Sequence, residues 1–222
     1  MAEHEEPEKI WDEYDWERFL QQQDRKTERY MDLLEKYLDD PNRDQIIARE
    51  MGWYHLLGED GRDWMENVES TFPEECEECE ECGEQEAGEC ETVIEDFEMH
   101  PLYQAAFGLT MWLDELFEEL GDLENHPSAI QLAAQSAVAS AKLAAALSED
   151  DADEIGMTIA YLKRALKAIP TAMEAAAEME KTIKFRPDQH AALHERLFQV
   201  RDGIIQSMGE YRLEWRRRFG SR

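Results

Sequence analysis

Four cysteines within an acidic stretch are the first residues whose types and spacing could do chemistry. They follow the pattern C-x2-C-x2-C-x7-C and are Cys76, Cys79, Cys82 and Cys90. Two-residue gaps let successive thiolates face one centre, as tetrahedral zinc sites and cubane iron–sulfur sites require. The spacing therefore predicts a structural metal site. Zinc ranks ahead of an iron–sulfur cluster because the stretch lacks apolar residues that would shield a cluster from solvent.

The residues around these cysteines act against metal binding. Both two-residue gaps are Glu-Glu. Nearby carboxylates raise the pKa of a thiol and so oppose formation of the thiolate, although they also attract cations. Two alternatives therefore stay open, namely a metal-free acidic loop and a disulfide or redox switch.

Three histidines form a second candidate metal site. His126 precedes an apolar helical pattern, and His190 and His194 lie one helical turn apart near the start of the last predicted helix. Histidines at this spacing can chelate one metal ion. The carboxylates near them in the sequence are Glu124, Asp188 and Glu195. The Glu-x-x-His pairs of ferritin-like di-iron proteins are absent, so capping or surface roles are the alternative.

Signatures of catalysis are missing from the sequence. It contains no G-x-G-x-x-G, no Walker loop, no G-x-S-x-G and no H-E-x-x-H. We therefore expect a protein that is not an enzyme. An enzyme with a site between helices, around His126 and His190, is the weaker alternative.

The segment from Pro127 to Leu147 is the centre of the predicted fold. It reads PSAIQLAAQSAVASAKLAAAL and carries a single charge, Lys142. A helix that is small and apolar all round is normally buried on several sides. We therefore expect an inner helix. Its two Gln, three Ser and Lys142 make a poor lipid-facing surface, so we expect no membrane span.

Helical periodicity extends along most of the remaining chain. It predicts further helices at Pro7–Asp40, Asn42–Leu57, His100–Glu124, from Ile155 onward with a kink at Pro170, and at Asp188–Phe219. Short connections between the last four helices favour antiparallel neighbours. The predicted fold is all-α, an antiparallel up-down-up-down four-helix bundle over residues 99–222 with an additional long N-terminal helix. Residues 1–73 hold that helix and a shorter one, and residues 74–98 form an acidic Cys-rich linker.

The charge balance restricts the partners that the protein could bind. The chain has 53 acidic and 23 basic residues, a net charge of −30. Residues 1–100 hold 34 acidic and 9 basic residues, so most of the excess lies there. Such a field repels nucleic acids and anionic membranes and favours basic protein surfaces and divalent metals. Solubility, or adaptation to a salty cytoplasm, is the alternative explanation.

Two further expectations concern location and the C-terminal arginines. The first ten residues, MAEHEEPEKI, lack the features of a signal peptide, which favours the cytoplasm. In the predicted bundle the last helix ends where the helix from His100 begins. Its basic residues are Arg212, Arg216, Arg217, Arg218 and Arg222. We expect them to dock the acidic segment Glu74–Glu91, unless they only complement the dipole of their own helix.

Together these observations favour a non-enzymatic, acidic helical-bundle protein. It would serve as a protein-interaction or regulatory module that engages a basic protein surface, with a structural metal in the Cys-rich loop. The alternative is a metal-binding or redox protein in which the cysteine cluster, holding zinc or an iron–sulfur cluster, is the working centre.

Overall fold

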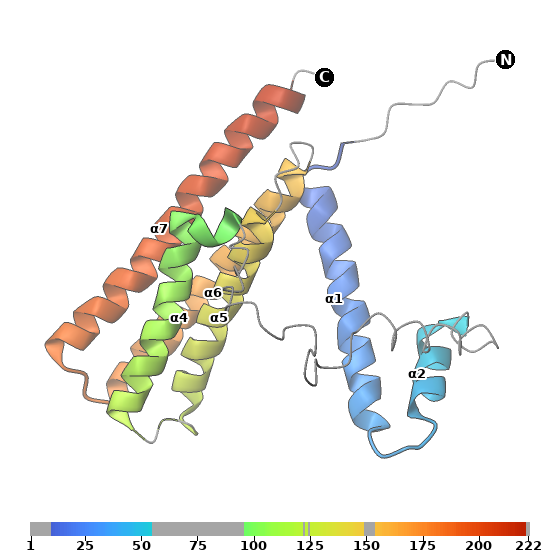
Figure 1. Ribbon diagram of the computed structural model, residues 1–222, viewed down its shortest axis with the longest axis horizontal. Coiled ribbons are helices and arrows are strands. Elements are labelled where there is room, and N and C mark those ends of the chain that lie inside the picture. Colours follow the sequence, from blue (N-terminus) through green and yellow to red (C-terminus); the bar gives the residue numbers. More distant parts are fainter. Residues whose placement is uncertain (1–9, 55–95, 122, 124, 149–153, 221–222) are drawn as a thin grey trace, which may run out of the picture. The chain divides into compact units, whose positions relative to one another are not determined.

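The computed structural model describes residues 10–54, 96–121, 123, 125–148 and 154–220, and no strand occurs among them. The regular structure is all-helical, as the periodicity predicts (Figure 1). The helices are α1 (Glu13–Lys36), α2 (Arg43–Met51), the 3-10 turn η3 (Asp96–Met99), α4 (Pro101–Leu120), α5 (Pro127–Leu147), α6 (Ile155–Thr182) and α7 (Pro187–Phe219).

Local chemistry explains several of the helix boundaries. Proline occupies the first turn of α4, α5 and α7, where its missing N–H leaves no hydrogen bond unmade. His100 caps α4 by accepting a hydrogen bond at Nδ1 from the Leu102 N–H, at 3.2 Å. Helix α2 ends at Gly52, whose left-handed φ of 76° favours glycine. The helix therefore ends before the predicted Leu57. The spacing of apolar residues alone does not reveal that a glycine ends the helix.

The chain divides into two compact units, residues 19–92 and residues 1–18 together with 93–222. In the first unit, side chains of α1 contact the region of α2. Arg29 donates a hydrogen bond from Nη2 to the Glu50 carbonyl oxygen at 2.6 Å. The rings of Tyr30 and Trp53 lie 5.8 Å apart.

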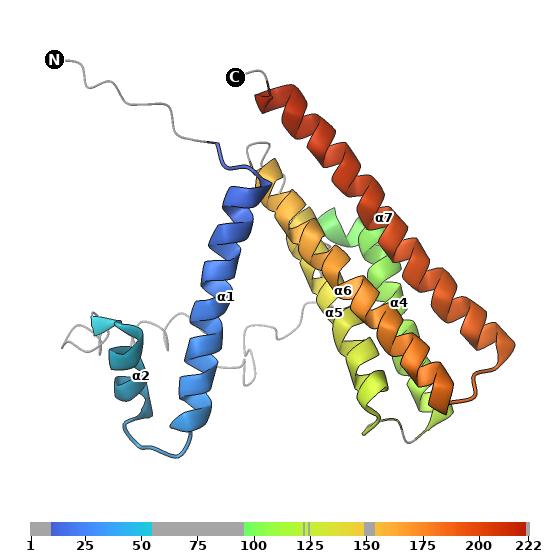
Figure 2. The same ribbon diagram turned by 180° about the vertical axis from the view of Figure 1, so that it is seen from behind.

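The second unit is built around the four long helices α4 to α7, which lie side by side in both views (Figures 1 and 2). Helix α4 contacts α5 and α7, and α6 also contacts both α5 and α7. One apolar cluster joins the four helices. Its largest fully buried side chains include Leu109, Leu113, Leu132, Leu143, Leu162, Ile169, Met179, Leu193, Leu197 and Ile204.

Helix α6, and not α5, contributes the most buried residues to this core. Buried positions recur along its whole length, from Ile155 to Met179, and the helix continues through Pro170. Helix α5 has the predicted bounds, but it is buried along one face only, and Ile130 and Val138 on its other side are 53% and 41% exposed. The prediction of burial on several sides was therefore wrong. Alanine has a high helix propensity and little apolar surface, so it is also tolerated where a helix faces solvent.

By length and apolar composition, α5 also meets the criterion for a membrane-spanning helix, which core helices meet as well.

The first residues of α1 belong to the second unit and contact its long helices. Glu13 accepts hydrogen bonds from Arg212, the shorter at 2.8 Å, and Glu17 accepts one from Arg164 at 3.2 Å. Gly156, in the first turn of α6, lies against the backbone of Trp11 and Asp12. A larger residue has no room there, so this glycine permits the close approach.

Two glycine substitutions test this approach. In Gly156→Ala the added methyl group would overlap the Trp11 carbonyl oxygen, so we expect a loss of about 1–3 kcal/mol in the free energy of unfolding. Gly209→Ala in α7 meets no atom within 4 Å and removes a poor helix former, so we expect a gain of about 0.5–1 kcal/mol. Chemical denaturation measures both. Equal gains from the two substitutions would contradict the close contact at Gly156.

A second pair of substitutions tests which face of α5 is buried. Leu132 is fully buried, so Leu132→Ala is expected to cost about 2–5 kcal/mol in the free energy of unfolding. Ile130→Ala, on the exposed side of the same helix, is expected to change it by less than about 0.5 kcal/mol. Similar losses from both, in the same denaturation experiment, would mean that both faces of α5 are covered.

Candidate functional site

The site lies where α6 ends and α7 begins. A short connection, residues 183–186, reverses the chain between them. The Arg186 N–H donates to Gln189 Oε1 at 3.0 Å, and Gln189 Nε2 donates to Glu119 Oε2 at 2.9 Å. These bonds fix the first turn of α7 against α4. The last turns of α6 therefore face the first turns of α7.

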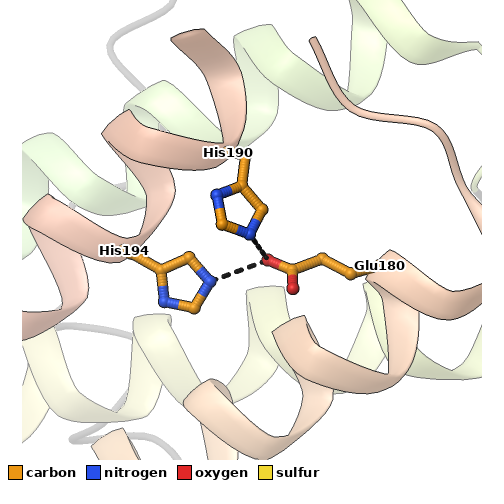
Figure 3. Close-up of side chains that lie close together, drawn as sticks. All are labelled: Glu180, His190 and His194. Carbon is orange, nitrogen blue, oxygen red and sulfur yellow. Dashed lines mark hydrogen bonds and ion pairs between the residues drawn. The ribbon is translucent and has the colours of Figure 1, made fainter. Parts of the chain in front are cut away.

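Three side chains converge at this end of the second unit, as Figure 3 shows. Glu180 comes from α6, and His190 and His194 come from successive turns of α7. Glu180 Oε1 lies 2.8 Å from His194 Nε2 and 3.2 Å from His190 Nε2. The two imidazole rings are tilted against each other, with centroids 4.6 Å apart. One carboxylate oxygen thus faces two imidazole nitrogens.

The three side chains differ in their exposure to solvent. Glu180 is 22% exposed, His194 is 31% exposed and His190 is 52% exposed. The ring of His194 also lies 6.3 Å from that of Phe198, one turn further along α7. The cluster therefore has an inner side against α6 and α7 and an outer side, at His190, that is open to solvent.

This arrangement has the donors and nearly the spacing of a metal site. The possible ligand atoms all lie within 4.8 Å of one another. A tetrahedral zinc ion about 2.0–2.2 Å from nitrogen and oxygen donors holds those donors about 3.3 Å apart. The two observed nitrogen–oxygen distances, 2.8 and 3.2 Å, are slightly shorter. A bound ion would therefore require the carboxylate oxygen to lie slightly farther from the imidazole nitrogens than it does here. Without one, two imidazoles that carry their proton on Nε2 can both donate to the same oxygen.

Of the three histidines singled out by the sequence, His190 and His194 are brought together, and His126 is not part of the cluster. His126 Nε2 lies 3.0 Å from Thr182 Oγ1, and that hydroxyl donates to the Met179 carbonyl oxygen at 3.1 Å. The hydroxyl proton is already used, so His126 Nε2 is the donor. His126 Nδ1 is buried and has no hydrogen-bond partner among the described residues.

The carboxylate that lies beside these histidines is not one of those expected from the sequence. Asp188 pairs with Arg186 at 3.4 Å, and neither Asp188 nor Glu195 belongs to the cluster. Glu124 lies outside the described residues. Glu180 is the carboxylate that meets the histidines. The sequence does contain a signal for this contact. Glu180 and His190 are equally far along the chain from Phe185, which lies in the connection between the two helices. An antiparallel helical hairpin places such residues side by side.

The other predicted site residues lie mostly beyond the described part of the chain. Cys76, Cys79, Cys82 and Cys90 are outside it, and so is Glu74–Glu91, the predicted docking segment of the C-terminal arginines. That docking remains a prediction.

Three of the arginines have acidic partners within the second unit. Arg212 pairs with Glu13 at 2.8 Å, and Arg217 and Arg218 both bond Glu214. The hydrogen bonds from Arg217 and then Arg218 lower the pKa of Glu214 below its ordinary value. The stabilisation from the pairs that Arg217 and Arg218 form with Glu214 is therefore present at neutral pH and is lost as the pH falls through that lowered pKa.

Two of the cavities lined by described residues lie elsewhere in the second unit. One, of about 170 Å³, is lined by Glu13, Arg212 and Trp215 among others, and one, of about 120 Å³, by Trp112, Glu119 and Arg186 among others. Both are smaller than the roughly 300 Å³ at which pockets for small organic ligands begin. The cluster of Glu180, His190 and His194 is therefore the better candidate for a functional site.

No protein-family model, no curated protein and no solved structure matches this chain. Comparison with known proteins therefore does not indicate a function.

Proposed function

We propose that this protein is a non-enzymatic metal-binding helical protein, in which Glu180, His190 and His194 hold one divalent transition-metal ion. The observation that carries the proposal is the shared oxygen, Glu180 Oε1, which lies 2.8 Å and 3.2 Å from two imidazole nitrogens. Side chains from two different helices supply these three donors.

The proposed scaffold for the site is an antiparallel four-helix bundle of α4 to α7, with α1 as an additional helix. Two observations support this arrangement. Each of the four helices contacts two of the others, and the connections 121–126 and 183–186 are short. Short connections favour antiparallel neighbours. In such a scaffold the core packing of α6 on α7, and not the loop, sets the distance between Glu180 and the histidines.

The donor set selects the class of metal. Two imidazole nitrogens and one carboxylate oxygen suit zinc, cobalt, nickel and copper, whereas magnesium and calcium prefer oxygen ligands alone. Two histidines and a glutamate are also a known ligand set of zinc. The net charge of −30 favours cations near the surface in general. Zinc is therefore the cofactor that we propose first.

A zinc titration by calorimetry tests the site. The parent is the full chain with all four cysteines replaced by serine, so that thiolates do not contribute. We expect one zinc ion per chain, and more than about a 100-fold loss of affinity in His194→Ala and in Glu180→Ala, because each removes a direct ligand. Affinity is also expected to fall at lower pH, since protons compete with the metal for imidazole nitrogens.

His126→Ala is the matched control for this titration, because His126 lies at the same end of the second unit but outside the cluster. It is expected to bind zinc like the parent. Unchanged zinc affinity in both His194→Ala and Glu180→Ala would contradict the proposed site.

The cysteine cluster remains a separate proposal for a second metal. The spacing of Cys76, Cys79, Cys82 and Cys90 supports it, with zinc ahead of an iron–sulfur cluster. Metal content per chain, compared between the natural sequence and the Cys76→Ser/Cys79→Ser variant, distinguishes this site from the histidine site. A redox function centred on the cysteines would be favoured by a visible absorbance band of the iron–sulfur type.

A second candidate function is recognition of a basic protein surface by the acidic N-terminal half. The observation that favours it is the location of the charge, with 34 acidic and 9 basic residues among the first 100. The same charge disfavours nucleic acids and anionic membranes. An electrostatic contact of this kind acts mainly on the rate of association and weakens with salt.

Two charge-neutralised variants test where a basic partner binds. The probe is a lysine homopolymer of about 20 residues, which is long enough to span several Debye lengths. The first replaces six glutamates of the N-terminal half by glutamine, namely Glu74, Glu75, Glu77, Glu78, Glu80 and Glu81. The control neutralises six exposed acids of the second unit, namely Asp114, Glu118, Glu174, Glu195, Asp202 and Glu210. We expect the first variant to bind more weakly by fluorescence anisotropy at low salt. Equal losses would contradict a site in the N-terminal half.

A further inference from the structure

The first residues of α1 form a contact with α6 and α7 that is independent of the proposed metal site. Residues 11–18 read WDEYDWER, with four acidic residues and two tryptophans. They belong to the same compact unit as the long helices, yet the chain joins them to those helices only through residues 19–92, which form the other unit. This segment is therefore a tethered ligand of α6 and α7.

Opposite charges join the segment to the two helices. Glu13 Oε2 accepts a hydrogen bond from Arg212 Nη2 at 2.8 Å and lies 3.9 Å from Lys163 Nζ. Glu17 Oε2 accepts a hydrogen bond from Arg164 Nε at 3.2 Å. The side chains of Glu13 and Arg164 are only 13% and 14% exposed, so salt screens these pairs less than it screens pairs on the open surface.

The backbone of the segment also fits the first turn of α6. A Cβ atom at Gly156 would overlap the Trp11 carbonyl oxygen and lie 3.0 Å from Trp16 Cδ1. The rings of Trp11 and Trp16 pack edge to face with centroids 5.0 Å apart. Lys163 Nζ lies 4.6 Å from the centroid of the Tyr14 ring, which is a cation–π contact. Charge, shape and aromatic contacts therefore all favour this particular segment.

The contact is less completely packed than the apolar core of α4 to α7. A cavity of about 170 Å³ is lined by Asp12 and Tyr14 of the segment and by Ile159 and Trp215 of the two helices, among others. Unfilled space removes dispersion contacts between the atoms on either side of it. Docking of the segment thus depends on the ion pairs more than the core does, and we expect it to be lost without unfolding of the four helices.

We propose that a surface on α6 and α7 is a docking site for residues 11–18, and that a second copy of this chain can supply this segment in place of the chain's own. The surface is formed by Gly156, Lys163, Arg164 and Arg212. Exchange of identical elements between two copies preserves these contacts, so its cost in free energy is low.

The tether determines which of the two arrangements is populated. A tethered segment competes at an effective concentration of at most the order of 1 mM, so at about 10 µM chain the contact within one chain is favoured by up to about 100-fold. The parent chain therefore uses its own segment at this concentration. Exchange becomes measurable when the contact within one chain is blocked.

Charge reversal blocks the contact within one chain and permits it between two. One variant is the full chain with Glu13→Arg/Glu17→Arg, and the other is the full chain with Arg164→Glu/Arg212→Glu. Like charges face each other within either variant, whereas each segment meets opposite charges on the other variant. At the concentration above, sedimentation equilibrium is expected to give each variant alone the mass measured for the parent, and the equimolar mixture twice that mass.

The chain with all four reversals is the control, because it restores opposite charges within one chain. It is expected to have the mass of the parent and to melt at a higher temperature than either doubly substituted variant, by circular dichroism. A mixture with no species of twice the parent mass would overturn the exchange, and so would the same doubling in either variant alone. A fourfold variant that melts no higher than the two double variants would overturn the pairing of the segment with this surface.

Discussion

The apolar packing of α6 against α5 and α7 is the interaction on which the rest of this structure depends. Buried residues extend along α6 from Ile155 to Met179, and Leu193, Leu197 and Ile204 on α7 are fully buried in the same cluster. Because this packing fixes the end of α6 beside the start of α7, a glutamate and two histidines meet there without any loop having to hold them. Rigid elements of this kind position ligand side chains better than loops do.

Electrostatics acts on this framework in two ways. Locally, specific pairs such as Glu13 with Arg212 and Glu17 with Arg164 join the first turns of α1 to the long helices. Over longer distances, the excess of acidic residues, most of which lies in residues 1–100, favours cations and disfavours anions. A site with two imidazoles and one carboxylate fits this excess, because a bound divalent ion offsets part of the negative charge.

The sequence predicted the helices better than it predicted their burial or the site. Periodicity and proline placed Pro127–Leu147 with its observed bounds, and the start of α7 to within one residue. The alanine-rich composition of α5 suggested an inner helix, but alanine marks helix propensity as much as burial, and α6 is the more buried helix. The i, i+4 spacing identified His190 and His194. Their partner Glu180 was missed because it comes from a different helix, and only the pairing of α6 with α7 reveals it.

The most direct test of the central claim is the coordination of zinc in the full chain with its four cysteines replaced by serine, measured by X-ray absorption spectroscopy. We predict two imidazole nitrogens and at least one carboxylate oxygen, at about 2.0–2.2 Å from the metal. The scattering pattern of the imidazole rings should be lost in the His190→Ala/His194→Ala variant. A zinc ion surrounded by oxygen alone, or a spectrum that this double substitution leaves unchanged, would contradict the claim that α6 and α7 together form a metal site.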